Sequence, residues 1–100
     1  LPSGENLNNL NFDYVMSGES PAWKPLRIYN DGIRTIIQMP PTIAQSEAPT
    51  LLVVRGGEQV LVNYRLHDDR YIVDSLFDEA ILITGVGRAQ TKVVIKRSKS

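Results

Sequence analysis

The chain has no cysteine, a single histidine and a single tryptophan among its 100 residues. Without cysteine it cannot form a disulfide, a thiolate zinc site or a thiol nucleophile. No apolar stretch reaches the ~20 residues of a membrane-spanning helix. Residues 1–4 show neither the basic start nor the apolar run of a secretory signal peptide. A 3.6-residue hydrophobic period never persists over ~10 residues, so we expect no long amphipathic helix.

An excess of charge of either sign is also missing. Lys and Arg together number 11, as do Asp and Glu, so the formal net charge is zero. A neutral domain lacks the overall basic footprint of a nucleic-acid-binding protein, and we expect no direct nucleic-acid binding. Four cations near the C-terminus, Lys92, Lys96, Arg97 and Lys99, are interpreted as a solvated strand end. With 42% hydrophobic residues, the chain suffices for one domain with its own core.

The segment around which the chain is organised is residues 26–40, which have the pattern of strand, tight turn and strand. Asp31-Gly32 separates two runs rich in β-branched and aromatic residues. This dipeptide is a strong hairpin signal, because glycine adopts positive φ freely and aspartate tolerates it better than most residues. Pro25 and Pro40 bracket the unit, since proline lacks the N–H that a central strand donates. A β-hairpin is therefore predicted here.

Six further segments are short, rich in β-branched or aromatic residues and separated by turn residues. They are residues 11–17, 51–54, 60–66, 71–73, 80–84 and 91–97. The run 51–54 is continuously apolar, so we expect it to be buried on both faces. Residues 74–79 are expected to form a bend or a single helical turn that places Leu76 and Phe77 at the end of the core.

About seven to nine short strands at spacings of roughly 8–12 residues are typical of a sandwich or barrel. Turns this close together favour antiparallel neighbours, because a parallel crossover needs about a dozen connecting residues. We therefore predict an all-β fold, an antiparallel β-sandwich of the immunoglobulin-like kind with about 7–9 short strands. Residues 1–10 are expected to be a flexible linker end, 11–97 the β-sandwich domain and 98–100 a frayed tail.

No arrangement of side chains in the sequence indicates catalysis, a metal site or a cofactor. His67 adjoins two aspartates, but with one imidazole and no cysteine we interpret it as a hairpin-tip residue rather than a ligand. Asp74, Asp78 and Glu79 lie close together in the sequence and are interpreted as turn residues. A small hydrolase that uses these acids is a third hypothesis, which would need two carboxyl groups across a sugar-binding cleft.

Residues 23–40 carry a resemblance to a known family. Pro25 leads a strand, Tyr29 precedes Asn30-Asp31-Gly32, and Thr35 and an apolar close follow. This order resembles the C-terminal domain of the TrbG/CagX family, outer-membrane core-complex components of type IV secretion and conjugative transfer systems. Colinear matches follow at residues 49–54, 62–65, 71–77, 80–85 and 93–97. The similarity covers residues 11–97.

Three positions depart from the family's pattern. Asn30 stands where the family usually has Asp, Ile33 where it usually has a basic residue, and Ile36 where it prefers an aromatic residue. Asparagine tolerates positive φ as aspartate does, and Ile36 keeps an apolar side chain. The departures therefore concern the subfamily more than the fold.

The resemblance implies a non-enzymatic domain in the periplasm, associated with the outer membrane. It implies two partners, a small outer-membrane lipoprotein and the channel-forming core protein that spans the envelope, within a homo-oligomeric ring. It implies no cofactor. In such families a signal peptide and an N-terminal domain precede this domain, so the chain is expected to be an excised piece.

Four residues are candidates for partner binding. Phe12, Tyr14 and Met16 share one face of the first strand, and the first strand of a sandwich is commonly an edge to which an extended peptide can add. Trp23 is the best single anchor, because tryptophan is enriched at binding hot spots. We accordingly expect Trp23→Ala to weaken lipoprotein binding more than folding. The alternative, that all four are ordinary core residues, stays open.

A second hypothesis, from another class, is a carbohydrate- or ligand-binding sandwich. It would display Trp23 and Tyr29 on a flat face, and sugars would then change the tryptophan fluorescence. A stacking platform for nucleic acid on Tyr29 and Tyr64 is disfavoured, because both tyrosines lie in otherwise apolar strands.

Overall fold

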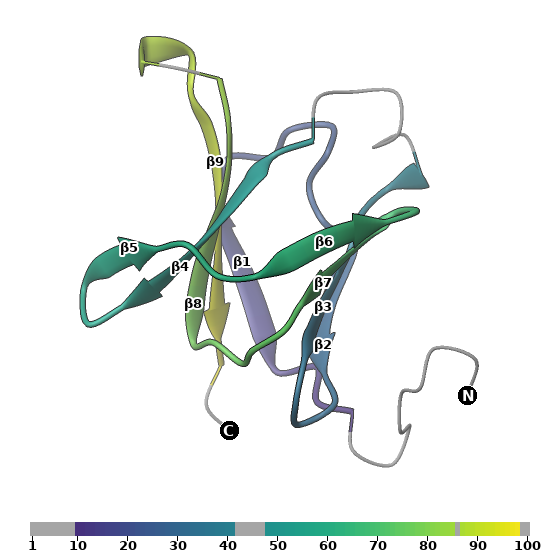
Figure 1. Ribbon diagram of the computed structural model, residues 1–100. Helices are drawn as coiled ribbons and strands as arrows, with labels where there is room; N and C mark the ends of the chain where they lie inside the picture. The colour runs from purple at the N-terminus through teal and green to yellow at the C-terminus, as the bar shows by residue number, and fades with distance from the viewer. Residues whose placement is uncertain (1–9, 42–47, 86, 99–100) are drawn as a thin grey trace.

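Nine β-strands in the described residues, 10–41, 48–85 and 87–98 of the computed structural model, form two antiparallel sheets that face each other (Figure 1). The strands are β1 (Tyr14–Gly18), β2 (Arg27–Asn30), β3 (Thr35–Gln38), β4 (Thr50–Arg55), β5 (Glu58–Val60), β6 (Tyr64–His67), β7 (Arg70–Val73), β8 (Glu79–Thr84) and β9 (Thr91–Arg97). The five-stranded sheet has the order β1-β9-β8-β4-β5, and the four-stranded sheet has the order β2-β3-β7-β6. The predicted all-β antiparallel sandwich is thereby confirmed.

A short 3-10 turn, η3 (Gly87–Ala89), precedes β9. None of the helical turns in the described part of the chain is long and apolar enough to cross a membrane.

The two sheets enclose a hydrophobic core built from alternate residues of the strands. Because successive side chains of a strand point to opposite faces, one face of each sheet is apolar. The core cluster consists of Trp23, Ile28, Ile37, Met39, Leu51, Val53, Tyr71, Val73, Phe77, Ala80, Leu82, Val93 and Ile95. Burial of one large apolar side chain stabilises the fold by about 1.5–3 kcal/mol, so this cluster is the main source of stability. Phe77 closes it from the bend between β7 and β8, as predicted, while Leu76 is half-buried.

The β2–β3 hairpin forms where Asp31-Gly32 predicts it, but with a longer turn. The last paired residues are Asn30 and Thr35, so residues 31–34 make the connection. Gly32 has a φ of 91°, whereas Asp31 does not adopt the left-handed region. The glycine is needed here for the conformational reason that the sequence indicates.

Asp31 instead contributes through its side chain. Its Oδ1 accepts the backbone N–H of Arg34 at 2.8 Å and that of Ile33 at 2.9 Å. These bonds, above all the one from Arg34, favour the carboxylate and lower the pKa of Asp31. The side chain thereby replaces backbone bonds that a tighter turn would have made.

The segment 60–66, predicted as one strand, is divided between the two sheets. β5 ends at Val60 in the five-stranded sheet, and β6 begins at Tyr64 in the four-stranded sheet. Val60, Val62 and Tyr64 are all half-buried against the core. The apolar alternation therefore continues through the corner at which the chain changes sheets. The prediction of a single strand over residues 60–66 was therefore wrong. Hydrophobic periodicity indicates which side of a segment is apolar, but it does not indicate which sheet the segment joins.

A second difference concerns β4. Leu51 and Val53 are fully buried, but Leu52 and Val54 are only half-buried because they lie on the outer face of the five-stranded sheet. The expectation that residues 51–54 are buried on both faces was therefore wrong.

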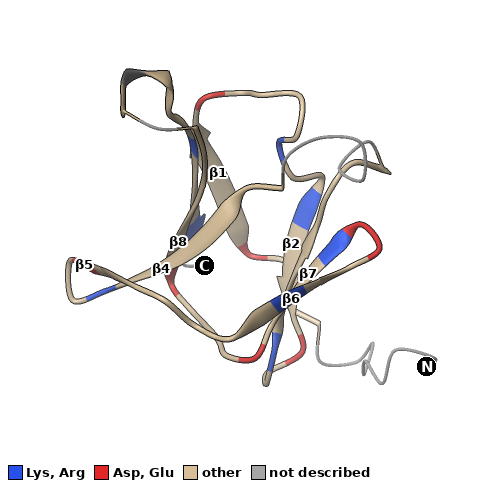
Figure 2. Ribbon diagram, turned by 45° about the horizontal axis from the view of Figure 1, so that its top comes forward, with Lys and Arg blue, Asp and Glu red and all other residues tan. Residues whose placement is uncertain are grey.

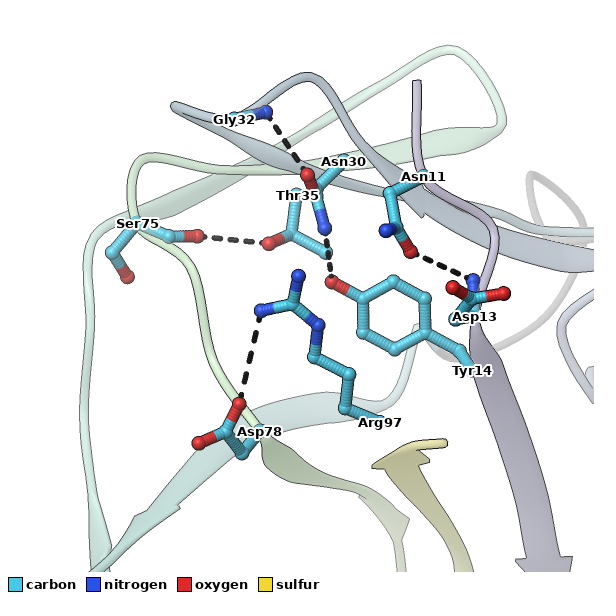
Figure 3. Close-up of polar contacts among 9 residues, drawn as sticks. All are labelled: Asn11, Asp13, Tyr14, Asn30, Gly32, Thr35, Ser75, Asp78 and Arg97. Carbon is cyan, nitrogen blue, oxygen red and sulfur yellow. Dashed lines mark hydrogen bonds and ion pairs between the residues drawn. The ribbon is translucent and has the colours of Figure 1, made fainter. Parts of the chain in front are cut away.

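Two buried hydroxyl groups tie loops to the four-stranded sheet. Thr35 is fully buried, and its Oγ1 donates to the carbonyl of Ser75 at 2.9 Å (Figure 3). The hydroxyl of Tyr71 donates to the carbonyl of Pro49 at 2.5 Å. Burial, and to a lesser extent the neighbouring Tyr64, raises the pKa of Tyr71 above its ordinary value. The phenol therefore stays protonated and keeps its donor role.

We predict that Thr35→Val lowers the free energy of unfolding by about 1–3 kcal/mol, because it leaves the carbonyl of Ser75 without its donor at almost unchanged side-chain volume. Urea unfolding followed by tryptophan fluorescence measures this. Thr50→Val is the matched control, since Thr50 is exposed at the start of β4 and should change stability by less than ~0.5 kcal/mol. Equal stability of the two variants would contradict the role given to this hydrogen bond.

Candidate functional site

β1 forms one edge of the five-stranded sheet, where β9 is its strand neighbour. Two backbone hydrogen bonds extend this pairing beyond the strand. The N–H of Ser98 donates to the carbonyl of Asp13 at 2.8 Å, and the N–H of Glu19 donates to the carbonyl of Lys92 at 3.1 Å. Ser98 is therefore bonded to the sandwich and is not part of the frayed tail predicted for 98–100. Residues 99–100 lie outside the described residues, as do residues 1–9 of the predicted linker end.

The two flanking bonds fix the direction of the backbone groups within β1. Bonded and non-bonded residues alternate along an antiparallel pair, so the backbone groups of Val15 and Ser17 face β9. The N–H and carbonyl groups of Met16 and Gly18 consequently point away from the sheet. The N–H of Tyr14 is occupied locally, because it donates to the carbonyl of Phe12 at 2.8 Å. Met16 and Gly18 thus present the unpaired groups to which a further strand adds.

The end of the neighbouring edge, at β2, is covered by the chain itself. Asn11 and Asn30 exchange two backbone hydrogen bonds of 2.8 and 3.0 Å, so Asn11 covers the end of β2. The Nδ2 of Asn30 also donates to the phenol oxygen of Tyr14 at 2.7 Å, as Figure 3 shows. The start of β1 is therefore bonded to both sheets, which holds this edge in place.

The predicted partner-binding residues divide into three environments. Tyr14 and Met16 are half-buried and pack against the core, so their side chains face inward and only the backbone of Met16 is presented. Phe12 is 54% exposed, and its ring lies on that of Tyr29 with the centroids 5.2 Å apart. Trp23 is 9% exposed and belongs to the core cluster. Partner binding by these four residues stays a prediction.

Two residues of this edge were missed by the sequence reasoning. Val15 is 52% exposed on the outer face of β1, beside the outward-facing backbone. Gly18 has a φ of 95°, and a Cβ there would lie 2.9 Å from the carbonyl oxygen of Lys92. Two features of the sequence could have indicated them. Val15 is an apolar residue on the face of the strand expected to be polar, and Gly18 is a glycine at the end of that strand.

The aromatic platform required by the carbohydrate hypothesis is absent from the described surface. Trp23 is buried in the core, and Tyr29 is only 8% exposed beneath Phe12. The expectation that Trp23 and Tyr29 share a flat, displayed face was therefore wrong. The two aromatics that had seemed available for stacking are covered.

His67 lies at the tip of the β6–β7 hairpin, as predicted. Its Nε2 is 3.6 Å from the Oδ2 of Asp68, and both side chains are exposed. Asp68 has a φ of 58°, which places it in the turn for which aspartate is suited. Within the described residues no group of three or more histidine or acidic side chains is arranged to hold a metal ion.

Asp74, Asp78 and Glu79 do not line a common cleft. Asp78 and Glu79 border an open hollow of about 530 Å³, whereas Asp74 borders a neighbouring hollow of about 340 Å³. The Oδ1 of Asp74 lies 3.4 Å from the Nε of Arg34, and the Oδ1 of Asp78 lies 3.8 Å from the Nη1 of Arg97. Each aspartate thus has its own cationic partner, and the geometry gives no support to a carboxylate pair.

Comparison with known proteins gives two findings. The family model CagX, described as conjugal transfer protein, matches residues 3–98. The chain is also 48% identical over 94 residues to the probable conjugal transfer protein TrbG of Sinorhizobium fredii (strain NBRC 101917 / NGR234). This alignment covers 94% of the chain and 34% of that protein. The chain therefore spans about a third of the length of the curated relative it matches.

The burial of Trp23 in the core makes a large loss of stability the expected result of its replacement. We now predict that Trp23→Ala lowers the free energy of unfolding by about 3–5 kcal/mol, because it leaves a cavity in the core. Phe12→Ala is the control, because a half-exposed ring at the chain's edge contributes less, about 1 kcal/mol. Denaturant unfolding of both variants measures the difference, and a Trp23 variant as stable as the Phe12 variant would contradict the structure.

Proposed function

Because the chain belongs to the CagX family of conjugal transfer proteins, we propose that it is a non-enzymatic interaction domain of a type IV secretion, or conjugative transfer, apparatus. In this proposal the domain lies in the periplasm at the outer membrane, in a ring of identical copies. It binds a small outer-membrane lipoprotein and the channel-forming protein that spans the envelope. Membership of the family supports a role in conjugative transfer, and the open sheet edge at β1 supports a partner that adds a strand.

The observation that carries the proposal is the open edge at β1. The outward N–H groups of Met16 and Gly18, and the outward carbonyls of the same strand, match the hydrogen-bonding needs of one extended peptide. Addition of a strand to an exposed sheet edge is a recurring mode of peptide recognition, in which the backbone supplies affinity and side-chain contacts supply specificity. A segment of the lipoprotein is the strand that we place there.

Backbone bonds alone do not account for stable binding at this edge. Each net hydrogen bond contributes about 0.5–1.5 kcal/mol, while association costs at least ~4 kcal/mol in lost translational and rotational freedom. The added strand must therefore also bury apolar surface. Val15 offers it, since it is 52% exposed on the outer face of β1 beside the outward backbone. Phe12, two residues before β1, adds exposed apolar surface where its ring covers Tyr29 of the other sheet. We accordingly expect an apolar residue opposite Val15 in the lipoprotein segment.

Replacement of Met16 tests the strand addition. Met16→Pro removes the outward N–H without removing a hydrogen bond to β9, and proline is tolerated on edge strands. Met16→Ala is the matched control, because it loses the same side-chain packing and keeps the N–H. Calorimetric titration with the mature lipoprotein of the same transfer system should show binding at least ~10-fold weaker for the proline variant than for the alanine variant, a difference of 1.4 kcal/mol.

Thermal unfolding of both variants shows whether the domain is still folded in each. If folded Met16→Pro and Met16→Ala bind the lipoprotein equally, the partner does not add to β1 and this part of the proposal fails.

A further inference from the structure

β6 is a second open edge, on the opposite side of the sandwich from β1. It ends the four-stranded sheet, where β7 is its strand neighbour. Residues 61–63 lead directly from β5 into β6, so these two edge strands lie on one side. On the other side, the hydrogen bond from Asn30 to Tyr14 joins β2 and β1. β5 has only three residues, so β6 is the longer edge on its side.

The outward backbone groups of β6 follow from its pairing with β7. The N–H of Asp74 donates to the carbonyl of Asn63 at 3.1 Å, which makes this a bonded pair just before β6. By alternation, the backbone groups of Arg65 and His67 face β7, and those of Tyr64 and Leu66 point outward. The side chain of Leu66 lies on the core side of the strand and is 39% exposed.

The outer face of the same sheet is basic. Alternation away from the core places Arg27 of β2, Arg70 of β7 and both Arg65 and His67 of β6 on this face. None of the four strands contains an aspartate or a glutamate. Figure 2 shows blue segments on β2, β6 and β7 and no red on these three strands. Asp68 lies beside His67 at the hairpin tip. Arg65 is two residues further from this aspartate along β6.

We propose that β6 accepts an extended acidic segment of a partner protein as a fifth strand of this sheet. In an antiparallel arrangement the partner residues opposite Arg65 and His67 would form non-bonded pairs, in which side chains are closest. Carboxylates at these two positions contact the guanidinium and imidazole groups, and an apolar residue between them covers Leu66. The recognised pattern is therefore acid, apolar residue, acid.

Charge also excludes the commonest other occupant of an open edge, a second copy of the chain. Two antiparallel β6 strands would bring their Arg65 side chains to the same face, where like charges opposite each other are destabilising. The chain also contains no two acidic residues separated by one residue, so it does not itself carry the recognised pattern. The residues of this chain therefore do not supply the segment themselves, which agrees with its assignment to a partner protein.

A synthetic peptide of alternating valine and aspartate, capped at both ends, tests the inference on the full chain by two-dimensional NMR titration. We expect saturable shifts centred on residues 64–67. A peptide with asparagine in place of each aspartate should bind the unchanged chain at least 10-fold more weakly. The valine–aspartate peptide should likewise bind the Arg65→Glu variant at least 10-fold more weakly than the unchanged chain. Lys92→Glu changes the charge equally on the other sheet and should leave binding within twofold.

Leu66→Pro separates strand addition from attraction by charge alone, because it removes an outward N–H and no cation. Its control, Leu66→Ala, shortens the same side chain and keeps the N–H. We expect Leu66→Pro to bind at least 10-fold more weakly than Leu66→Ala. Equal binding by these two variants, equal binding of the two peptides, or shifts confined to β1 would each overturn the inference, while the proposal for β1 would stand.

Discussion

The need of every backbone N–H and carbonyl group for a partner governs the form of this domain. Two antiparallel sheets have four edge strands, and each edge leaves alternate residues without an internal partner. The domain covers the end of the edge at β2 with Asn11 and shortens the edge at β5, but it leaves Met16 and Gly18 on β1, and Tyr64 and Leu66 on β6, facing outward. We therefore propose that the open edges are the places where partner strands bind this protein.

Rigidity makes such an edge useful. The half-buried side chains of Tyr14 and Met16 are held by the core, and the phenol of Tyr14 is bonded to Asn30 of the other sheet. A partner strand consequently meets a template whose geometry is already fixed, which lowers the entropy lost on binding. Tyr14 and Met16 thus contribute to the candidate site by positioning its backbone, whereas Phe12 and Val15 offer the exposed apolar contacts.

Local chemistry made the fold class predictable from the sequence. Features that depend on long-range contacts could not be predicted in this way. The Asp31-Gly32 turn and the strand at 91–97 could be identified because turn residues and β-branched runs act over a few neighbours. The division of 60–66 between two sheets could not, because both halves keep the same apolar side. Residue type alone does not report burial, so the sequence left open whether Trp23 is a binding anchor or a core residue. The β1 edge was foreseen from chain order, but its outward residues required the register with β9.

Backbone amide exchange, measured by NMR on the free domain and on its complex with the mature lipoprotein, tests the central claim most directly. In the free domain the amides of Val15 and Ser17 should already be protected by β9, and those of Met16 and Gly18 should exchange freely. At saturation with the lipoprotein, the account predicts new protection at Met16 and Gly18. Unchanged exchange at both residues in a fully formed complex would contradict it, because the lipoprotein would then bind without adding a strand to β1.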